Sequence, residues 1–289
     1  MVAIDLGSNT IRFIEFDGEK WGKSFEKIVR TAEGLQETRL IGNKALARII
    51  DAIGEAKENL DFTQPIQAYT TAAMRLADNS VEVLETLAAS TGIHFEIIDG
   101  EKEAILTLNA VLYRLSLLGL EPSSFVLADI GGGSTELTHY THNSVETVSL
   151  NFGILTLSEA GENTLVEKIQ RFKNVVQKSV PNQSATLVLT AGTPTTIAAY
   201  LCGMDYTTYE AEKINGYRLY LADCYRVYDE LLNMGESERT RYVGVGRENL
   251  IIAGILMVTA IYEAMGCEEA IIIDDGLREG IALEYYNLH

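Results

Sequence analysis

The sequence predicts an α/β protein built from two similar lobes with a cleft between them. Strand-like and helix-like segments alternate along the chain, which is the pattern of an α/β fold. Its 289 residues are enough for two domains, and 47% apolar with 22% charged residues is typical of a globular protein. A short strand-turn motif also occurs twice, at positions 124 residues apart, which indicates that the lobes are related.

The first lobe is expected to span residues 1–119. Apolar residues recur at helical spacing over 43–60, and Asn79 with Glu82 three positions later resembles a capping box at the start of the next helix. The strands predicted here are 2–6, 11–16, 66–70 and 95–98, and the helices are 43–60, one from about 79, and 101–118.

Residues 119–124, which include glycine, proline and two serines, form the predicted linker, and the second lobe is expected to span 120–289. We expect the last helix, which begins near Arg278, to pack back on the first lobe. The strands predicted here are 125–130, 134–140, 185–190 and 270–273, and the other helices are 217–233 and 248–265.

The repeated motif joins the ends of two strands. Residues 3–10 (AIDLGSNT) align with 127–134 (LADIGGGS), so that Asp5 corresponds to Asp129, an offset of 129 − 5 = 124. In both copies an apolar strand ends in Asp-x-Gly and a second strand follows at once. The repeat favours duplication of one lobe, with an aspartate at the same place in each.

Charge and composition exclude several classes of protein. The formal net charge of −18 disfavours binding to long nucleic acids, which require many Lys and Arg contacts to phosphate. The three cysteines (Cys202, Cys224 and Cys267) have no metal-ligand spacing. There is no apolar run of membrane-spanning length and no signal-peptide pattern at the start, so we expect a cytoplasmic protein without a membrane partner.

The glycine-rich turn within residues 129–136 (DIGGGSTE) is the strongest functional signal. Glycines allow a backbone to approach phosphate and point N–H groups at it, and the hydroxyls of Ser134 and Thr135 would add donors. No Lys-Ser/Thr follows, which excludes a Walker loop, and a strand rather than a helix continues, which excludes a dinucleotide fingerprint. The alternative is a plain tight hairpin with glycines at positive φ.

Asp129 and Glu136 flank this turn and predict a Mg²⁺ site. Both carboxylates would face the turn if they lie at the adjoining ends of its two strands, and Mg²⁺ prefers such oxygen ligands beside phosphate. No Lys or Arg occurs over residues 116–167, so a metal would have to neutralise the phosphate there. The alternative is a solvated acidic hairpin.

Further candidates surround these motifs. Residues 7–10 and 191–196 are hydroxyl- and glycine-rich, and the second of these opens a helix whose N–H groups form an anion site. Residues 100–104 (GEKEA) place carboxylates at a helix start, where they either favour the helix dipole or hold a water. Arg75, Arg247 and Arg278 are possible phosphate ligands or, alternatively, ordinary surface residues.

Together these stretches resemble the exopolyphosphatase / guanosine pentaphosphate phosphohydrolase family of the actin, sugar-kinase and acetate-kinase superfamily. The matching segments, which span the chain in the family's order, are AIDLGSNT, TTAAMRLADN, IIDGEKEA, LADIGGGSTEL, TAGTPTT, INGYRL and DDGLREG. The resemblance implies two ribonuclease-H-like lobes and Mg²⁺-dependent hydrolysis of the terminal phosphoanhydride bond of polyphosphate or a guanosine pentaphosphate. A homodimer and a role in the stringent response are further implications.

The resemblance also implies roles for particular residues. Glu103 matches the glutamate that activates water, Asp129 and Glu136 match the metal-binding acidic pair, and Arg75 matches a phosphate-binding arginine. The matching phosphate-binding backbone and walls are Gly131, Gly132, Gly133, Ser134, Ser8, Asn9, Gly192 and Thr193.

Three departures from the family pattern are visible. Lys102 stands where many relatives have glutamate, Ala191 replaces a common glycine, and the chain ends at His289 without the helical domain that follows in long relatives. We therefore expect a weak hold on long polyphosphate. Two other functions stay open: a non-catalytic sensor of polyphosphate or of guanosine tetra- or pentaphosphate, and an ATP-dependent kinase of the same superfamily.

Overall fold

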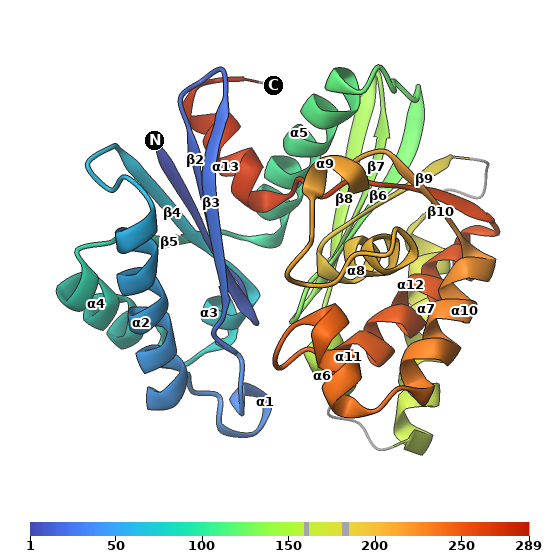
Figure 1. Cartoon of the computed structure of the whole chain (residues 1–289), viewed down its shortest axis with the longest axis horizontal. Coiled ribbons are helices and arrows are strands. Elements are labelled where there is room, and N and C mark those ends of the chain that lie inside the picture. The colour runs from blue at the N-terminus through green and yellow to red at the C-terminus, as the bar shows by residue number, and fades with distance from the viewer. Residues whose placement is uncertain (159–161, 181–184, 289) are drawn as a thin grey trace. The chain divides into compact units, whose positions relative to one another are not determined.

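The computed structural model describes residues 1–158, 162–180 and 185–288 and divides the chain into two compact units (Figure 1). Unit 1 contains residues 1–110 and 277–289, and unit 2 contains residues 111–276. Each unit has its own mixed sheet with helices packed on it, as expected for an α/β protein. None of the helices in the described residues is long and apolar enough to cross a membrane.

The sheet of unit 1 has the strand order β3-β2-β1-β4-β5. Its strands are β1 (Val2–Leu6), β2 (Thr10–Phe16), β3 (Trp21–Ile28), β4 (Ile66–Thr70) and β5 (Phe95–Ile97). Its helices are α1 (Leu35–Thr38), α2 (Asn43–Asn59), α3 (Ala72–Leu76), α4 (Ser80–Thr91), the first part of α5 (Gly100–Leu117) and α13 (Leu277–Tyr285). Helices α2 and α4 lie on one side of the sheet and α13 lies on the other (Figure 1).

The sheet of unit 2 has the strand order β10-β11-β9-β6-β7-β8. Its strands are β6 (Ser124–Ile130), β7 (Thr135–Thr141), β8 (Ser144–Leu150), β9 (Thr186–Thr190), β10 (Tyr217–Tyr220) and β11 (Glu269–Ile272). Its helices are α6 (Ile154–Ser158), α7 (Glu162–Ser179), α8 (Gly192–Leu201), α9 (Ala211–Ile214), α10 (Leu221–Asn233), α11 (Glu236–Val243) and α12 (Leu250–Met265).

The two sheets contain the same hairpin in the same register. Asp5 pairs with Arg12 across β1 and β2, and Asp129 pairs with Glu136 across β6 and β7, with the same offset of 124 for both members. In each sheet the first strand of the hairpin also pairs in parallel with a later strand: β1 pairs with β4 in unit 1, and β6 pairs with β9 in unit 2. The structure therefore confirms the internal repeat that the sequence indicated.

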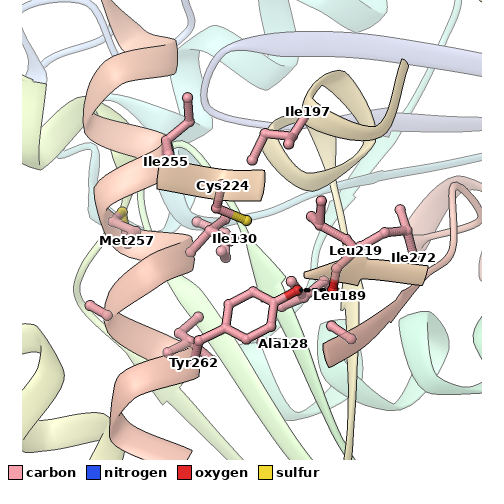
Figure 2. Close-up of a cluster of buried hydrophobic side chains, with 14 of the residues drawn as sticks. Ala128, Ile130, Leu189, Ile197, Leu219, Cys224, Ile255, Met257, Tyr262 and Ile272 are labelled. Carbon is pink, nitrogen blue, oxygen red and sulfur yellow. Dashed lines mark hydrogen bonds between the residues drawn. The ribbon is translucent and has the colours of Figure 1, made fainter. Parts of the chain in front are cut away.

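Helices α8, α10 and α12 pack on one face of the unit 2 sheet and form its core (Figure 2). Ile130 and Leu189 contribute from the strands, and Tyr262 of α12 lies among them with its hydroxyl donating to the carbonyl of Leu219 at 2.8 Å. Burial raises the pKa of the Tyr262 phenol, so its proton remains available for this bond.

The boundary between the units differs from the predicted one. Helix α5 is continuous from Gly100 to Leu117, so the change of unit between residues 110 and 111 falls inside a helix. The predicted linker forms the turn after α5, with Gly119 at φ +66°. Helix α13 belongs to unit 1, where it contacts β1, β2 and β4.

Three local expectations need correction. Residues 217–220 form strand β10 rather than the start of a helix, because they pair with β11. Asn79 precedes α4 but makes no capping hydrogen bond, because its side chain bonds both the N–H and the carbonyl of Ile41. Strands β3 and β8 were not predicted; both are edge strands with an exposed side and therefore lack a continuous apolar run.

Candidate active site

Unit 1 brings its candidate residues together at the carboxyl ends of its parallel strands. Strands β1, β4 and β5 run parallel, so their carboxyl ends meet at the same edge. The turn with Ser8 and Asn9 follows β1, helix α3 with Arg75 follows β4, and the first turn of α5 with Glu103 follows β5. Ligand sites of α/β proteins lie at such edges.

Arg75 and Glu103 form an ion pair. Nη1 of Arg75 donates to Oε2 of Glu103 at 2.8 Å and to the carbonyl of Ile98 at 2.7 Å. The two side chains are largely buried, at 22% and 11% exposure. Because Nε and Nη2 of Arg75 have no partner within the described residues, Arg75 can orient Glu103 and still offer donors to an anion.

The turn between β1 and β2 is fixed by backbone hydrogen bonds. Gly7 N–H donates to Thr10 O at 3.0 Å, while the carbonyls of Ser8 and Asn9 accept from residues 29–32 at 2.9 Å. The side-chain oxygen of Asn9 is buried and has no hydrogen-bond partner among the described residues. A buried polar atom of this kind needs a partner, so Asn9 is suited to a hydrogen-bonding ligand or water.

Lys102 is directed to the C-terminal helix of the same unit. Its ammonium donates to the hydroxyl of Tyr69 at 2.9 Å, and Tyr69 donates to Glu284 of α13 at 2.8 Å. Burial opposes the charge on Lys102, but the bond to Tyr69 and the Glu284 carboxylate leave its pKa raised. The lysine at this position of the GEKEA segment therefore holds the first turn of α5 in place.

Unit 2 places four polar residues in one row across its sheet. Ser149, Glu136, Asp129 and Thr190 are direct neighbours on β8, β7, β6 and β9. Directly paired residues face the same side of a sheet, so the Asp129 and Glu136 carboxylates are adjacent. Ser149 donates to Oε1 of Glu136 at 2.7 Å.

The equivalent row in unit 1 differs in one decisive residue. Arg12 occupies the position of Glu136, since 136 − 124 = 12, and pairs with Asp5 on the neighbouring strand. It also forms an ion pair with Glu26 at 3.4 Å. Unit 2 alone therefore has two adjacent carboxylates at this place in the repeat.

The glycine turn of unit 2 repeats the turn of unit 1. Gly131 N–H donates to Ser134 O at 2.9 Å, and the carbonyls of Gly131 and Gly132 accept from Ile154 and Leu155 at 3.0 and 2.9 Å. These bonds fix the turn without consuming the N–H groups of Gly132 and Gly133, which have no backbone acceptor within the described residues. These two N–H groups are suited to donate hydrogen bonds to an anion.

Two details of this turn bear on what the sequence left open: the plain-hairpin alternative and the role of Thr135. Gly131, Gly132 and Gly133 do not have positive φ, so they do not serve an ordinary tight hairpin. A Cβ on Gly131 would lie 3.0 Å from the carbonyl oxygen of Ser134, and a Cβ on Gly153 would lie 2.3 Å from the carbonyl oxygen of Gly132, so glycine is required where these backbone segments meet. The hydroxyl of Thr135 donates to Phe152 O at 2.7 Å, so it is not an available phosphate donor.

Helix α8 begins at the carboxyl end of β9, beside the same row. A Cβ on Gly192 would lie 2.9 Å from Nη2 of Arg247, so this guanidinium lies against the helix start. The guanidinium of Arg247 has no hydrogen bond or ion pair with another described residue, although the backbone of Arg247 is bonded to Gly244, Leu250 and Ile251. The side chain of Thr193 packs against Gly254 of α12, which leaves the backbone of Gly192 and Thr193 for an anion.

Ala191, which precedes α8, occupies a glycine conformation with φ 74° and ψ 179°. Such geometry costs a residue with a Cβ about 1–3 kcal/mol. We expect Ala191→Gly to raise the thermal midpoint by about 2–4 °C for each kcal/mol of strain released. Ala198→Gly, inside the same helix, should lower it. A calorimetric scan that places both variants below the parent protein would contradict the strain argument.

Sequence reasoning missed some residues of the site and misjudged others. Ser149 and Thr190 are recognisable only from strand register, although Thr190 does end a predicted strand. Arg278 is not an available cation, because its guanidinium pairs with Glu279 at 2.6 Å. No group of three or more His, Cys, Asp or Glu side chains suited to a metal occurs in the part of the chain that the structure describes.

The fold defines a two-lobed α/β protein of the actin-like class, in which each unit has polar turns at the carboxyl ends of parallel strands. The family model of the Ppx/GppA phosphatase family matches residues 23–289. The chain belongs to this family.

Relatives of known sequence and structure agree with this assignment. The chain is 28% identical to Exopolyphosphatase 2 of Mycobacterium tuberculosis, over 98% of the chain and 97% of that protein. It is 27% identical to Exopolyphosphatase 1 of Mycobacterium leprae, over 97% and 87% of the two chains. The crystal structure of the Ppx/GppA family member of Aquifex aeolicus is similar with a TM-score of 0.79 and 26% identity, over 100% of this chain and 98% of that one.

Proposed function

We propose that this protein is a Mg²⁺-dependent phosphohydrolase that releases the terminal phosphate of inorganic polyphosphate. The observation that carries the proposal is the largely buried Arg75–Glu103 ion pair at the carboxyl ends of the parallel strands β1, β4 and β5. The names of the relatives, two exopolyphosphatases, indicate the substrate class. Guanosine pentaphosphate, which ends in the same phosphoanhydride bond, is the second substrate to test.

Glu103 is the proposed general base. Its carboxylate accepts the proton of a water whose oxygen attacks the terminal phosphorus, while the bond from that phosphorus to the bridging oxygen breaks. The shortened chain leaves with the bridging oxygen, and inorganic phosphate is the other product. Because Arg75 fixes one oxygen of Glu103, the other oxygen is held in a defined orientation for the water.

Asp129 and Glu136 are the proposed Mg²⁺ ligands. Mg²⁺ commonly takes only one or two protein carboxylates and completes its shell with waters and phosphate oxygens, so two adjacent carboxylates are sufficient. Ser149 would hold the Glu136 side chain in place from the next strand. When bound, the metal would supply positive charge to the phosphate oxygens.

Backbone N–H groups and arginines would hold the phosphates. The donors proposed are the amides of Gly132, Gly133, Ser134, Gly192 and Thr193, the Ser8–Asn9 turn, Arg75 and Arg247, whereas the Gly131 amide is already bonded within the turn. The absence of an acidic partner for Arg247 among the described residues supports its use, because a carboxylate would compete with phosphate. Phosphoryl transfer depends mainly on such positioning and charge stabilisation.

One assay separates this proposal from its two rivals. Phosphate release is measured with polyphosphate and with guanosine pentaphosphate, and ATP consumption is measured with and without a sugar, each with Mg²⁺. A phosphohydrolase releases phosphate from one or both of the first two without an acceptor. Sugar-dependent consumption of ATP would instead identify a kinase, and tight binding without any turnover would identify a sensor.

A further inference from the structure

Three arginines have no side-chain partner within the described residues: Arg30, Arg171 and Arg247. The other arginines bind a carboxylate or backbone carbonyl, as expected in a protein with net charge −18. Arg171 lies on the exposed side of α7, and the guanidinium of Arg247 lies against the start of α8. Arg30 lies in unit 1 and has no role in the proposed function so far.

The backbone of Arg30 is attached to the candidate phosphate turn. Its N–H donates to the carbonyl of Asn9 at 2.9 Å, and its neighbour Val29 donates to the same oxygen at 2.9 Å. Arg48 fixes the segment from the other side, because its Nε donates to Val29 O at 2.8 Å and its guanidinium pairs with Glu33 at 2.6 Å. A direct backbone hydrogen bond therefore fixes the position of Arg30 relative to Asn9.

Arg30 has a left-handed backbone, with φ +48°, although it has a long side chain. This conformation is unfavourable for a residue with a Cβ, and glycine would adopt it freely. The chain thus has an exposed, unpaired cation at a position where glycine would fit better. Residues held in such conformations are concentrated at functional sites.

We propose that Arg30 binds a phosphate of the substrate chain other than the one under attack. This inference rests on the proposed function. As whole residues, Glu103 and Ser8 are only 9% and 5% exposed, so the reacting phosphate must lose most of its hydration there. Arg30 is exposed, so its planar guanidinium can bind a phosphate that remains partly solvated. It is a determinant of substrate affinity, not a catalytic residue.

Arg39 provides a matched control. It is also exposed and left-handed, with φ +61°, and lies in the same unit. Its guanidinium, however, pairs with Asp78 at 3.0 Å. Glycine at either position removes one cation and one strained residue, and only glycine at position 30 should affect substrate binding.

The experiment compares Arg30→Gly, Arg30→Lys and Arg39→Gly with the parent protein on polyphosphate. Arg30→Gly should raise KM about threefold to thirtyfold, the range for one charge-assisted contact at an exposed site, with kcat within about twofold. Its KM should depend less on salt than that of the parent, and its thermal midpoint should be unchanged or higher. Arg30→Lys should restore part of the affinity, and Arg39→Gly should leave KM unchanged.

Isothermal titration with tripolyphosphate separates this inference from the proposed function. If the parent protein binds tripolyphosphate but hydrolyses nothing, the proposed activity fails while weaker binding by Arg30→Gly still supports the subsite. If Arg30→Gly binds and hydrolyses like the parent, or loses kcat at unchanged KM, the assignment of Arg30 is overturned. Absence of any phosphate binding by the parent protein would overturn both.

Discussion

Glu103→Gln is expected to lower kcat for phosphate release by about 10²–10⁴-fold, which is the usual contribution of a general base. Glutamine has nearly the same shape and its carbonyl oxygen can still accept from Arg75, but it cannot take a proton from water at neutral pH. Substrate affinity should therefore stay close to that of the parent protein. Initial rates and isothermal titration with polyphosphate give the two quantities.

Glu101→Gln is the control for this variant. Glu101 lies in the same first turn of α5 but is exposed, so the change removes one carboxylate of equal charge at nearly the same helix position. Its kcat should be within about twofold of the parent value. Turnover by Glu103→Gln at the level of Glu101→Gln would remove Glu103 from the mechanism.

Asp129→Asn is expected to raise the Mg²⁺ concentration for half-maximal activity by at least about tenfold. A neutral amide is a poorer ligand than a carboxylate, and loss of even an outer-shell partner costs about 10–100-fold in metal affinity. Mg²⁺ should also raise the thermal midpoint of the parent protein more than that of the variant, because a ligand that binds only the folded state stabilises it. This second readout does not depend on activity.

Glu146→Gln is the matched control for the metal. Glu146 is an exposed carboxylate on β8, in the same sheet but three residues along the strand from the row that contains Glu136. It should leave the Mg²⁺ dependence unchanged. An equal shift in both variants would indicate a general charge effect, and no shift in Asp129→Asn would exclude Asp129 as a ligand.

The repeated hairpin shows how much of the site could be predicted from the sequence. The apolar strand before the glycine turn and the strand that follows it at once predict a hairpin, so the adjacency of Asp129 and Glu136 follows from their spacing once the turn is placed. The same argument locates Ser8 and Asn9. These residues are close in sequence, and local patterns are sufficient for such pairs.

The pairing of Arg75 with Glu103 could not be predicted in this way. The two residues are 28 positions apart, and they meet because β4 and β5 are parallel neighbours whose carboxyl ends lie together. Strand order is a property of the whole sheet and not of either segment. Ser149 and Thr190 were not predicted as site residues for the same reason. Each lies beside Glu136 or Asp129 only because of the register in which its strand pairs with β7 or β6.

The hydrogen-bond partner of a polar side chain was also hard to predict where two partners were available. Thr135 follows the glycine turn and was expected to donate to phosphate, but the chain returns after β8 and places the carbonyl of Phe152 within 2.7 Å. Asn79 likewise bonds Ile41 across the unit instead of capping its own helix. In both cases a tertiary contact replaces the local hydrogen bond that the sequence suggests.

Hydrolysis of polyphosphate in ¹⁸O-labelled water tests the central claim most directly. If a water held by Glu103 attacks the terminal phosphorus, each released phosphate molecule carries one ¹⁸O atom from the solvent and the shortened chain carries none. Mass spectrometry of phosphate from a Mg²⁺-containing reaction gives this distribution. Unlabelled phosphate, or label found at the new end of the shortened chain, would contradict the account, because the attacked atom would then not be the terminal phosphorus.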